Sequence, residues 1–185
     1  SLDMKEFVER IIGLFRAATS SKEGDAALAD ACCVDIVSKA EALARARGYR
    51  IQTTREQFGR RQVAHAADMV RCMMNLVDNA MSYAPPDTTV HLAFSESGLP
   101  DSPQSRALRM DVEDEGPGFS EEALARATER FYRQDAARLH DGHHGLGLHI
   151  VQEEMRRCSG ALHLENTKKG ARTTLFIPFL DEQKE

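Results

Sequence analysis

Residues 71–84 of this chain read R-C-M-M-N-L-V-D-N-A-M-S-Y-A and are followed directly by Pro85 and Pro86. At about 100° per residue, this stretch and the turn before it have one broad apolar face, formed by Met69, Met73, Leu76, Val77, Ala80, Met81 and Ala84. The other face is polar and carries Asp68, Arg71, Asn75, Asp78, Asn79 and Ser82. This period predicts an amphipathic helix that packs its apolar face on a core and ends at the prolines.

Two asparagines of the polar face, Asn75 and Asn79, are four residues apart, so their amides lie one helical turn above each other. Asparagine is a poor helix former because its amide competes for backbone hydrogen bonds. Two asparagines in successive turns are therefore typical of a surface that offers carbonyl oxygens to a hard cation or a polar ligand. For the helix taken alone, an ordinary solvated face is the simpler interpretation.

The composition is that of a globular domain, with 42% hydrophobic and 29% charged residues. A net charge of −5 excludes a general nucleic-acid binder, which would show a basic footprint. No apolar run approaches the length of a membrane span. The four cysteines lack the spacing of a zinc site, and we expect them to be small apolar residues in a reducing compartment.

Apolar periodicity predicts further helices at residues 4–18, 25–47 and 145–158, and a short one capped by Ser120. In the helix at 25–47, which Gly48 ends, the expected core residues are Val34, Ile36, Val37, Ala40 and Leu43. Strands are predicted at 49–53, 88–94, 108–112, 161–165 and 173–179, with another near Val63. We expect a turn region at 95–105 and a mobile loop at 131–144. This mixture of elements favours a two-layer α/β sandwich.

Three polar stretches lie between or beside these elements. Asp114-Glu115-Gly116-Pro117-Gly118 follows a strand, where a carboxylate and glycines allow a flat ligand to approach the backbone. Gly142-His143-His144-Gly145-Leu146-Gly147 opens a helix, whose exposed amides favour an anion. Arg130-Phe131-Tyr132-Arg133 places two cations around an aromatic pair. Taken singly, a plain turn, a helix cap and a solvated loop explain them as well.

The order of these motifs is more specific than any one of them. An N-x-x-x-N helix, D-x-G-x-G, R-F-Y-R and G-x-x-G-L-G-L follow one another, and the chain closes with G-A-R-T-T-L-F-I-P. Residues 26–180 thereby resemble the catalytic ATP-binding domain of sensor histidine kinases, within the gyrase, heat-shock-ninety, histidine kinase and mismatch-repair superfamily. The resemblance implies an α+β Bergerat-type fold, a mixed, mostly antiparallel sheet of about five strands backed by three helices. Residues 1–24 resemble the tail of a preceding dimerisation helix, and residues 25–185 the catalytic domain.

The resemblance also implies roles for single residues, with ATP and magnesium as ligands. Asn79 would bind the magnesium ion that bridges the ATP phosphates, and Asn75 would be its partner on the phosphate side. Asp114 would accept a hydrogen bond from the adenine amino group. Tyr83 would lie against the adenine ring.

The glycine motifs and the arginines complete the implied site. Gly116 and Gly118 would let the backbone clear the base. Phe131, with Arg130 and Arg133, corresponds to the family's F box, where an arginine meets phosphate. The helix start at Gly145, Leu146 and Gly147 would cradle phosphate. The implied catalytic residues are Asn75, Asn79 and Arg133.

Three positions depart from the family pattern. Ser82 stands where the family has a lysine or arginine, so a phosphate cation is missing, for which Arg133 or Arg138 is the expected substitute. His143-His144 replaces glycine followed by serine or threonine. Glu115 replaces a common asparagine and adds a negative charge near the base. These departures affect the expected catalytic rate and the strength of nucleotide binding more than the expectation that the domain binds a nucleotide at all.

Three functions follow from the resemblance. The leading one is a histidine kinase catalytic domain that presents the γ-phosphoryl of Mg-ATP to a histidine on a separate domain. The alternatives are a weakly catalytic nucleotide-sensing pseudokinase and an ATP-hydrolysing domain, although the latter needs a glutamate where Asn75 stands. No histidine has the context of a phosphoacceptor, so we expect a fragment of a cytoplasmic region. The implied partners are ATP or ADP, its own dimerisation domain in a homodimer, a response regulator and a membrane anchor outside the fragment.

Overall fold

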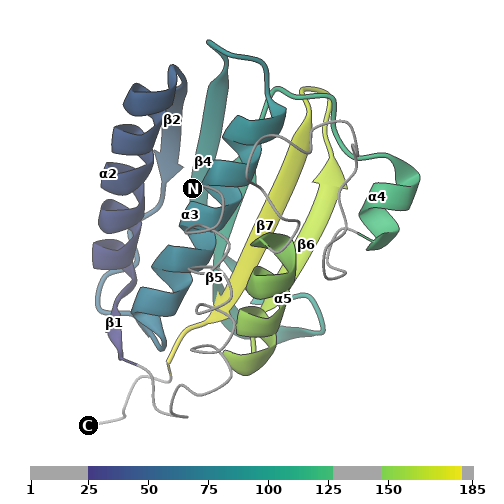
Figure 1. Cartoon of the computed structure of the whole chain (residues 1–185). Coiled ribbons are helices and arrows are strands. Elements are labelled where there is room, and N and C mark those ends of the chain that lie inside the picture. Colours follow the sequence, from purple (N-terminus) through teal and green to yellow (C-terminus); the bar gives the residue numbers. More distant parts are fainter. Residues whose placement is uncertain (1–24, 127–146, 181–185) are drawn as a thin grey trace, which may run out of the picture.

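The computed structural model describes residues 25–126 and 147–180 as two layers, with helices α2, α3 and α5 covering one face of a five-stranded sheet (Figure 1). The helices are α2 (Ala29–Arg47), α3 (Ala66–Tyr83), α4 (Glu121–Arg126) and α5 (Gly147–Arg157). The strands are β1 (Ala27–Leu28), β2 (Arg50–Arg55), β3 (Gln62–Val63), β4 (Thr89–Leu99), β5 (Ser102–Glu113), β6 (Ala161–Asn166) and β7 (Ala171–Pro178). The predicted fold class is confirmed. The predictions for residues 4–18 and 131–144 lie outside the described residues.

The main sheet has the strand order β2-β4-β5-β7-β6. Only β2 and β4 pair in parallel, and the other three neighbouring pairs are antiparallel. The central strands β4, β5 and β7 bury side chains under the helices, among them Leu92, Met110 and Leu175. In β7 the buried residues are consecutive, from Thr173 to Ile177. A second, two-stranded sheet joins β1 to β3 and was not predicted as such.

Helix α3 lies in the middle of the helical layer, between α2 and α5 (Figure 1). Every residue of its predicted apolar face is buried: Met69, Met73, Leu76, Val77, Ala80, Met81 and Ala84. Cys72 is also fully buried on α3, as are Cys32 and Cys33 on α2, which agrees with their expected role as small apolar residues. Because the core occupies one face, the polar face of α3 is left for other contacts.

Helix α2 differs from its prediction at its start and in one core residue. It begins at Ala29 rather than at residue 25, because Leu28 keeps an extended backbone and pairs with β3. Asp25 instead serves α3, since its carboxylate accepts a hydrogen bond from the Ala67 N–H at 3.3 Å. Val34, predicted as core, is 56% exposed, because the buried face of α2 runs through Ile36 and Ala40. Gly48 ends the helix as predicted, with φ of 78°.

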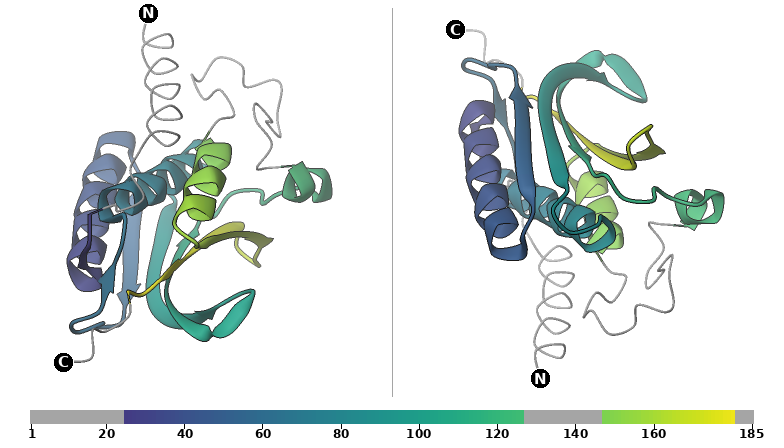
Figure 2. Two further views of the ribbon diagram at one scale, coloured as in Figure 1. Left: turned by 90° about the horizontal axis from the view of Figure 1, so that it is seen from below. Right: turned by 90° about the horizontal axis from the view of Figure 1, so that it is seen from above.

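The predicted turn region at 95–105 is wrong for most of its length. Strands β4 and β5 continue through it as one long hairpin, whose far end curls away from the helical layer (Figure 2). The glycine that suggested a turn lies at a bulge, where the register shifts between Gly98 and Leu99. A Cβ at Gly98 would lie 2.4 Å from the Pro103 carbonyl oxygen. The backbones of β4 and β5 are therefore too close at this point for a side chain at position 98.

The described helices contain no segment long and apolar enough to cross a membrane.

Candidate functional site

Asp114 comes directly after the end of β5, the central strand of the sheet. Backbone groups of two different segments hold its side chain in place. Its Oδ1 accepts hydrogen bonds from the Gly116 N–H at 2.8 Å and the Ala171 N–H at 3.3 Å. Its own backbone N–H donates to the Ala171 carbonyl oxygen at 3.0 Å. Both backbone donors reach the same oxygen, and Oδ2 makes no hydrogen bond to the residues that the structure describes.

Asp114 as a whole residue is 7% exposed, and burial raises the pKa of its carboxyl group because little water solvates the charge. The hydrogen bonds from Gly116 and Ala171 act in the opposite direction, since they stabilise the carboxylate. Glu113 adds a smaller contribution that raises the pKa further. The result is a desolvated, oriented acceptor, whose hydrogen bond to a donor is strong because little water competes for it.

Glycines lie beside the Asp114 carboxyl group, at positions where there is no room for a side chain. A Cβ at Gly116 would lie 2.9 Å from Asp114 Oδ1 and 3.1 Å from the Tyr83 carbonyl oxygen. A Cβ at Gly170 would lie 2.4 Å from the Asp114 carbonyl oxygen. Gly118 has φ of 76°, a conformation that favours glycine. The predicted base-reading residues Asp114, Gly116 and Tyr83 are thus brought together.

Asn166, at the end of β6, holds the loop that follows Gly118. Its Oδ1 accepts from the Phe119 N–H at 2.6 Å, and its Nδ2 donates to the Phe119 carbonyl oxygen at 2.6 Å. Gly116, Gly170 and Ala171 surround the Asp114 carboxyl group and are here called, with it, the Asp114 cradle. The sequence indicated Gly170 and Ala171 only as the start of its closing motif, and Asn166 carried no sequence signal.

The two asparagines of α3 are half-buried on its polar face, Asn79 about one turn and Asn75 about two turns before Tyr83. Neither the Asn75 nor the Asn79 side chain makes a hydrogen bond to any residue in 25–126 or 147–180. Their amide oxygens are thus available as neutral oxygen ligands. Magnesium prefers oxygen ligands and keeps several waters, so this donor set fits the ion.

Helix α5 lies beside α3 and runs antiparallel to it (Figure 1). Arg157, its last residue, contacts Asp68 in the first turn of α3 at 2.9 Å. Gly147 is ten residues before Arg157, about 15 Å along the helix axis. The same rise along α3 leads from Asp68 to the neighbour of Asn79. The start of α5 therefore lies toward the asparagine pair rather than toward Asp68.

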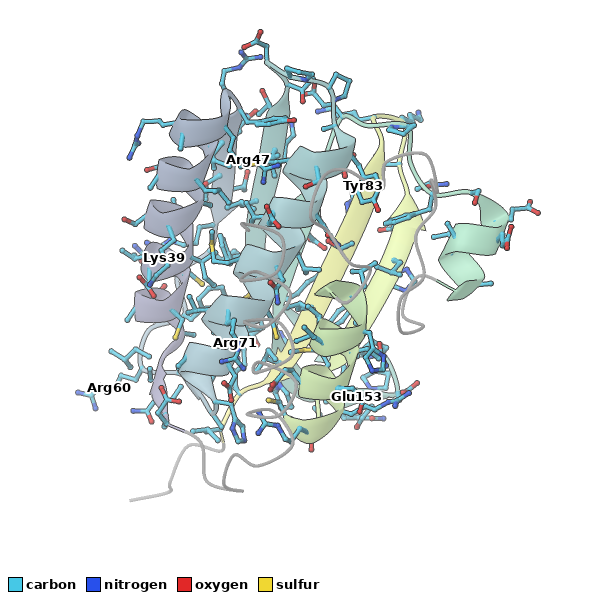
Figure 3. All side chains as sticks on the ribbon, in the orientation of Figure 1. Lys39, Arg47, Arg60, Arg71, Tyr83 and Glu153 are labelled. Carbon is cyan, nitrogen blue, oxygen red and sulfur yellow. The ribbon has the colours of Figure 1, made fainter. Side chains whose placement is uncertain are left out.

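Ser82 carries no charge, and a cation from another helix contacts it. Its hydroxyl donates to the Asp78 carbonyl oxygen at 2.8 Å and accepts from Arg47 Nη2 at 3.3 Å. Arg47 also forms an ion pair with the Asp78 carboxylate. Figure 3 shows Arg47 on the α2 side of α3 and Tyr83 toward α5 and β7. Sequence reasoning missed this arginine because α2 and α3 are adjacent only in the fold.

Glu115, the other departure near the base, has its carboxylate 3.6 Å from His91 Nε2. The predicted contributions of Arg130, Phe131, Arg133, Arg138, His143, His144, Gly145 and Leu146 lie outside the described residues. The described half of the site therefore consists of the asparagine pair, Tyr83, the Asp114 cradle and the start of α5.

Comparisons with known proteins identify the family of this domain. The family model for histidine kinase-, DNA gyrase B- and HSP90-like ATPases matches residues 64–181. The chain is 32% identical over 136 residues to the signal transduction histidine-protein kinase/phosphatase MprB of Mycolicibacterium smegmatis, covering 74% of this chain and 26% of MprB. It is 35% identical over 113 residues to the sensor histidine kinase SpaK of Bacillus subtilis, covering 60% of this chain and 23% of SpaK. The chain thus spans about a quarter of these relatives' length.

Solved structures share the fold. Full-length ShkA in complex with AMPPNP aligns with a TM-score of 0.75 at 21% identity, covering 97% of this chain and 37% of ShkA. The nucleotide-free catalytic domain of the histidine kinase ThkA aligns with a TM-score of 0.68 at 17% identity, covering 84% of this chain and 95% of the ThkA domain. The chain belongs to the histidine kinase-, DNA gyrase B- and HSP90-like ATPase family, and the relatives it resembles most in sequence among those named here are sensor histidine kinases.

Proposed function

We propose that this domain binds Mg-ATP and presents its γ-phosphoryl group to a histidine on a separate dimerisation domain. The observation that carries the proposal is the Asp114 carboxylate, whose Oδ1 is held by two backbone N–H groups. Oδ2 can then accept a hydrogen bond from the amino group of adenine. Guanine presents a carbonyl oxygen at that position, so two acceptors would face each other and GTP should bind poorly.

The phosphates would extend from this base site along the polar face of α3. Asn75 and Asn79 would hold the metal through their amide oxygens, and the first-turn N–H groups of α5 would meet the phosphate oxygens. Magnesium, when bound, would neutralise phosphate charge and orient the γ-phosphoryl group. The contribution of the protein is mainly positioning and electrostatic stabilisation, because phosphoryl transfer needs little covalent chemistry from the enzyme.

Two alternatives make different predictions at the same site. A domain that hydrolyses ATP needs a carboxylate to activate water, and the Asn75 amide cannot accept a proton. A pseudokinase would bind nucleotide without phosphoryl transfer, and Ser82 is the feature that favours it. Addition of a dimerisation domain with an acceptor histidine separates the possibilities, since only a kinase labels that histidine from γ-labelled ATP.

We expect magnesium to strengthen ATP binding to this domain, and Asn79→Ala to weaken Mg-ATP binding about tenfold, or roughly 1.4 kcal/mol. The reason is the loss of one amide oxygen from the metal. Titration calorimetry with ATP, with and without magnesium, measures both effects. Adenosine is the control, because it has no phosphate and its affinity should depend on neither magnesium nor Asn79. Equal ATP affinity with and without magnesium would remove Asn79 from the metal site.

We also expect the isolated chain to bind ATP or ADP without labelling itself. A phosphoacceptor histidine of the kinase type has an acid and then a proline after it on a helix, and no histidine here has that context. Incubation with γ-labelled ATP, followed by electrophoresis under alkaline conditions, should show no labelled protein. A stable acid-labile phosphohistidine on this chain would contradict the expectation.

In the whole protein we propose that the domain acts in a homodimeric, cytoplasmic portion of a sensor anchored in the membrane elsewhere. The histidine phosphorylated by the domain would pass its phosphoryl group to a response regulator. These assignments rest on the family, whose members matched here are sensor kinases about four times as long as the matched region.

A further inference from the structure

Four charged side chains join the start of α3 to the end of α5 in a closed ring, here called the ion ring. Arg71 Nη2 lies 2.8 Å from Asp68 Oδ1 and 3.2 Å from Glu154 Oε1. Arg157 Nη2 lies 2.9 Å from Asp68 Oδ2 and also pairs with Glu154 Oε2. Each carboxylate thus contacts both arginines, so the charges alternate around the ring.

Glu154 is the unusual member, because its side chain is 0% exposed. Its neighbour Met155 and the preceding Val151 belong to the hydrophobic core. Burying a carboxylate costs several kcal/mol that ion pairing only partly returns, and an apolar side chain of similar volume would stabilise such a position as well or better. Stability alone therefore does not explain a glutamate here, whereas a requirement for one defined helix position does.

The ion ring fixes the register of α5 along α3, which apolar packing alone constrains least. Apolar side chains of two helices interdigitate in several similar registers, while charged hydrogen bonds fix donor and acceptor atoms in one arrangement. The ring sets Arg157 opposite Asp68, and because the helices are antiparallel, Gly147 then lies toward the Asn79 end of α3. A slip of α5 along its axis at the ring moves the N-terminal turn of α5 by the same amount.

We propose that Glu154 is a positioning residue, which holds the N-terminal turn of α5 beside the asparagine pair through Arg71 and Arg157. The role assigned to that turn, contact with phosphate, rests on the proposed function. The adenine site is built from β5, β7 and the end of α3, so it does not depend on the ring. Loosening the ring should therefore weaken contacts to phosphate and spare contacts to the base.

The test is Glu154→Gln, which keeps the size of the side chain and removes its charge. Mg-ATP affinity should fall roughly tenfold, since small displacements of binding groups have effects of this size, while adenosine affinity stays unchanged. The matched control is Met155→Ala on the same turn, which leaves a cavity but keeps the ring. It should lower the melting temperature without changing the ratio of Mg-ATP to adenosine affinity.

A double-mutant cycle shows whether the effect passes through the ring. If it does, Glu154→Gln combined with Arg71→Met should weaken Mg-ATP binding less than the product of the two single effects. Equal loss of Mg-ATP and adenosine affinity in Glu154→Gln, or no loss of either, overturns the proposal.

A second measurement keeps the two proposals distinguishable. Amide hydrogen exchange at 151–154, whose N–H groups donate to the carbonyl groups of the first turn of α5, should accelerate in Glu154→Gln more than in Met155→Ala, with or without nucleotide. If wild-type protein binds no Mg-ATP, the proposed function fails, and this exchange still decides the role of Glu154. Equal exchange in the two variants overturns the positioning role.

Discussion

Asp114→Asn is expected to weaken ATP binding by about 1.5–3 kcal/mol, the size of a hydrogen bond to a charged group. The substitution keeps an oxygen at Oδ1, so the hydrogen bonds from Gly116 and Ala171 can persist. It replaces Oδ2 by an NH₂ group, which would then face the amino group of adenine. Two donors would oppose each other where the wild type pairs a donor with a charged acceptor.

The same substitution is expected to stabilise the nucleotide-free protein. Burial raises the folded-state pKa of Asp114 above its ordinary value, so the folded state binds the proton more tightly than the unfolded state. At pH values above the folded pKa the charged group therefore costs stability. That cost disappears as the pH falls through the folded pKa to below the unfolded one. Asparagine removes the cost at neutral pH, so the melting temperature of the variant should exceed that of the wild type.

Calorimetric titration with ATP and GTP, and thermal unfolding without nucleotide, measure the two effects. Asp111→Asn on the same strand is the matched control, since its carboxylate pairs with Arg109 and accepts from the Thr174 hydroxyl at 2.5 Å. It should leave ATP affinity unchanged. Equal affinities of the wild type for ATP and GTP would show that Asp114 does not read the base.

Features that depend on local pattern could be predicted from the sequence. The buried face of α3 follows from its helical period, because each apolar residue there packs on the same core. The end of α2 follows from Gly48, since glycine readily adopts the positive φ found there. Asp114, Gly116 and Tyr83 could be placed in one site because the spacing of the motifs resembles that of a known family.

Features that depend on tertiary partners could not be predicted. Val34 is apolar like a core residue, but it does not lie on the buried face of α2. Which face of α2 is buried depends on where the helix packs on the sheet. Gly98 signals a turn by itself, although a partner strand turns it into a bulge. Arg47 reaches Ser82 across two helices. The expected substitutes for a cation at Ser82, Arg133 and Arg138, lie outside the described residues.

Gly170→Ala is expected to lower the free energy of unfolding by about 3 kcal/mol, at the upper end of the range for overpacking. The new Cβ would lie 2.4 Å from the Asp114 carbonyl oxygen and 2.8 Å from both Asp114 Oδ1 and the Gly116 nitrogen. None of these atoms belongs to the flexible end of a long side chain. The backbone after β5 must therefore shift, and ATP binding should be lost together with stability.

Gly48→Ala is the matched control for this prediction, because the two glycines are needed for different reasons. Gly48 has φ of 78°, and a Cβ at this position would have no atom within 4 Å, so alanine there meets only the backbone strain of about 1–2 kcal/mol. Denaturant unfolding should therefore rank Gly170→Ala below Gly48→Ala in stability, and only Gly170→Ala should abolish ATP binding at temperatures where both variants are folded. If Gly170→Ala binds ATP as the wild type does, the Asp114 carbonyl can move without disturbing its carboxylate, and the close contact at Gly170 is not what holds the base-reading acceptor in place.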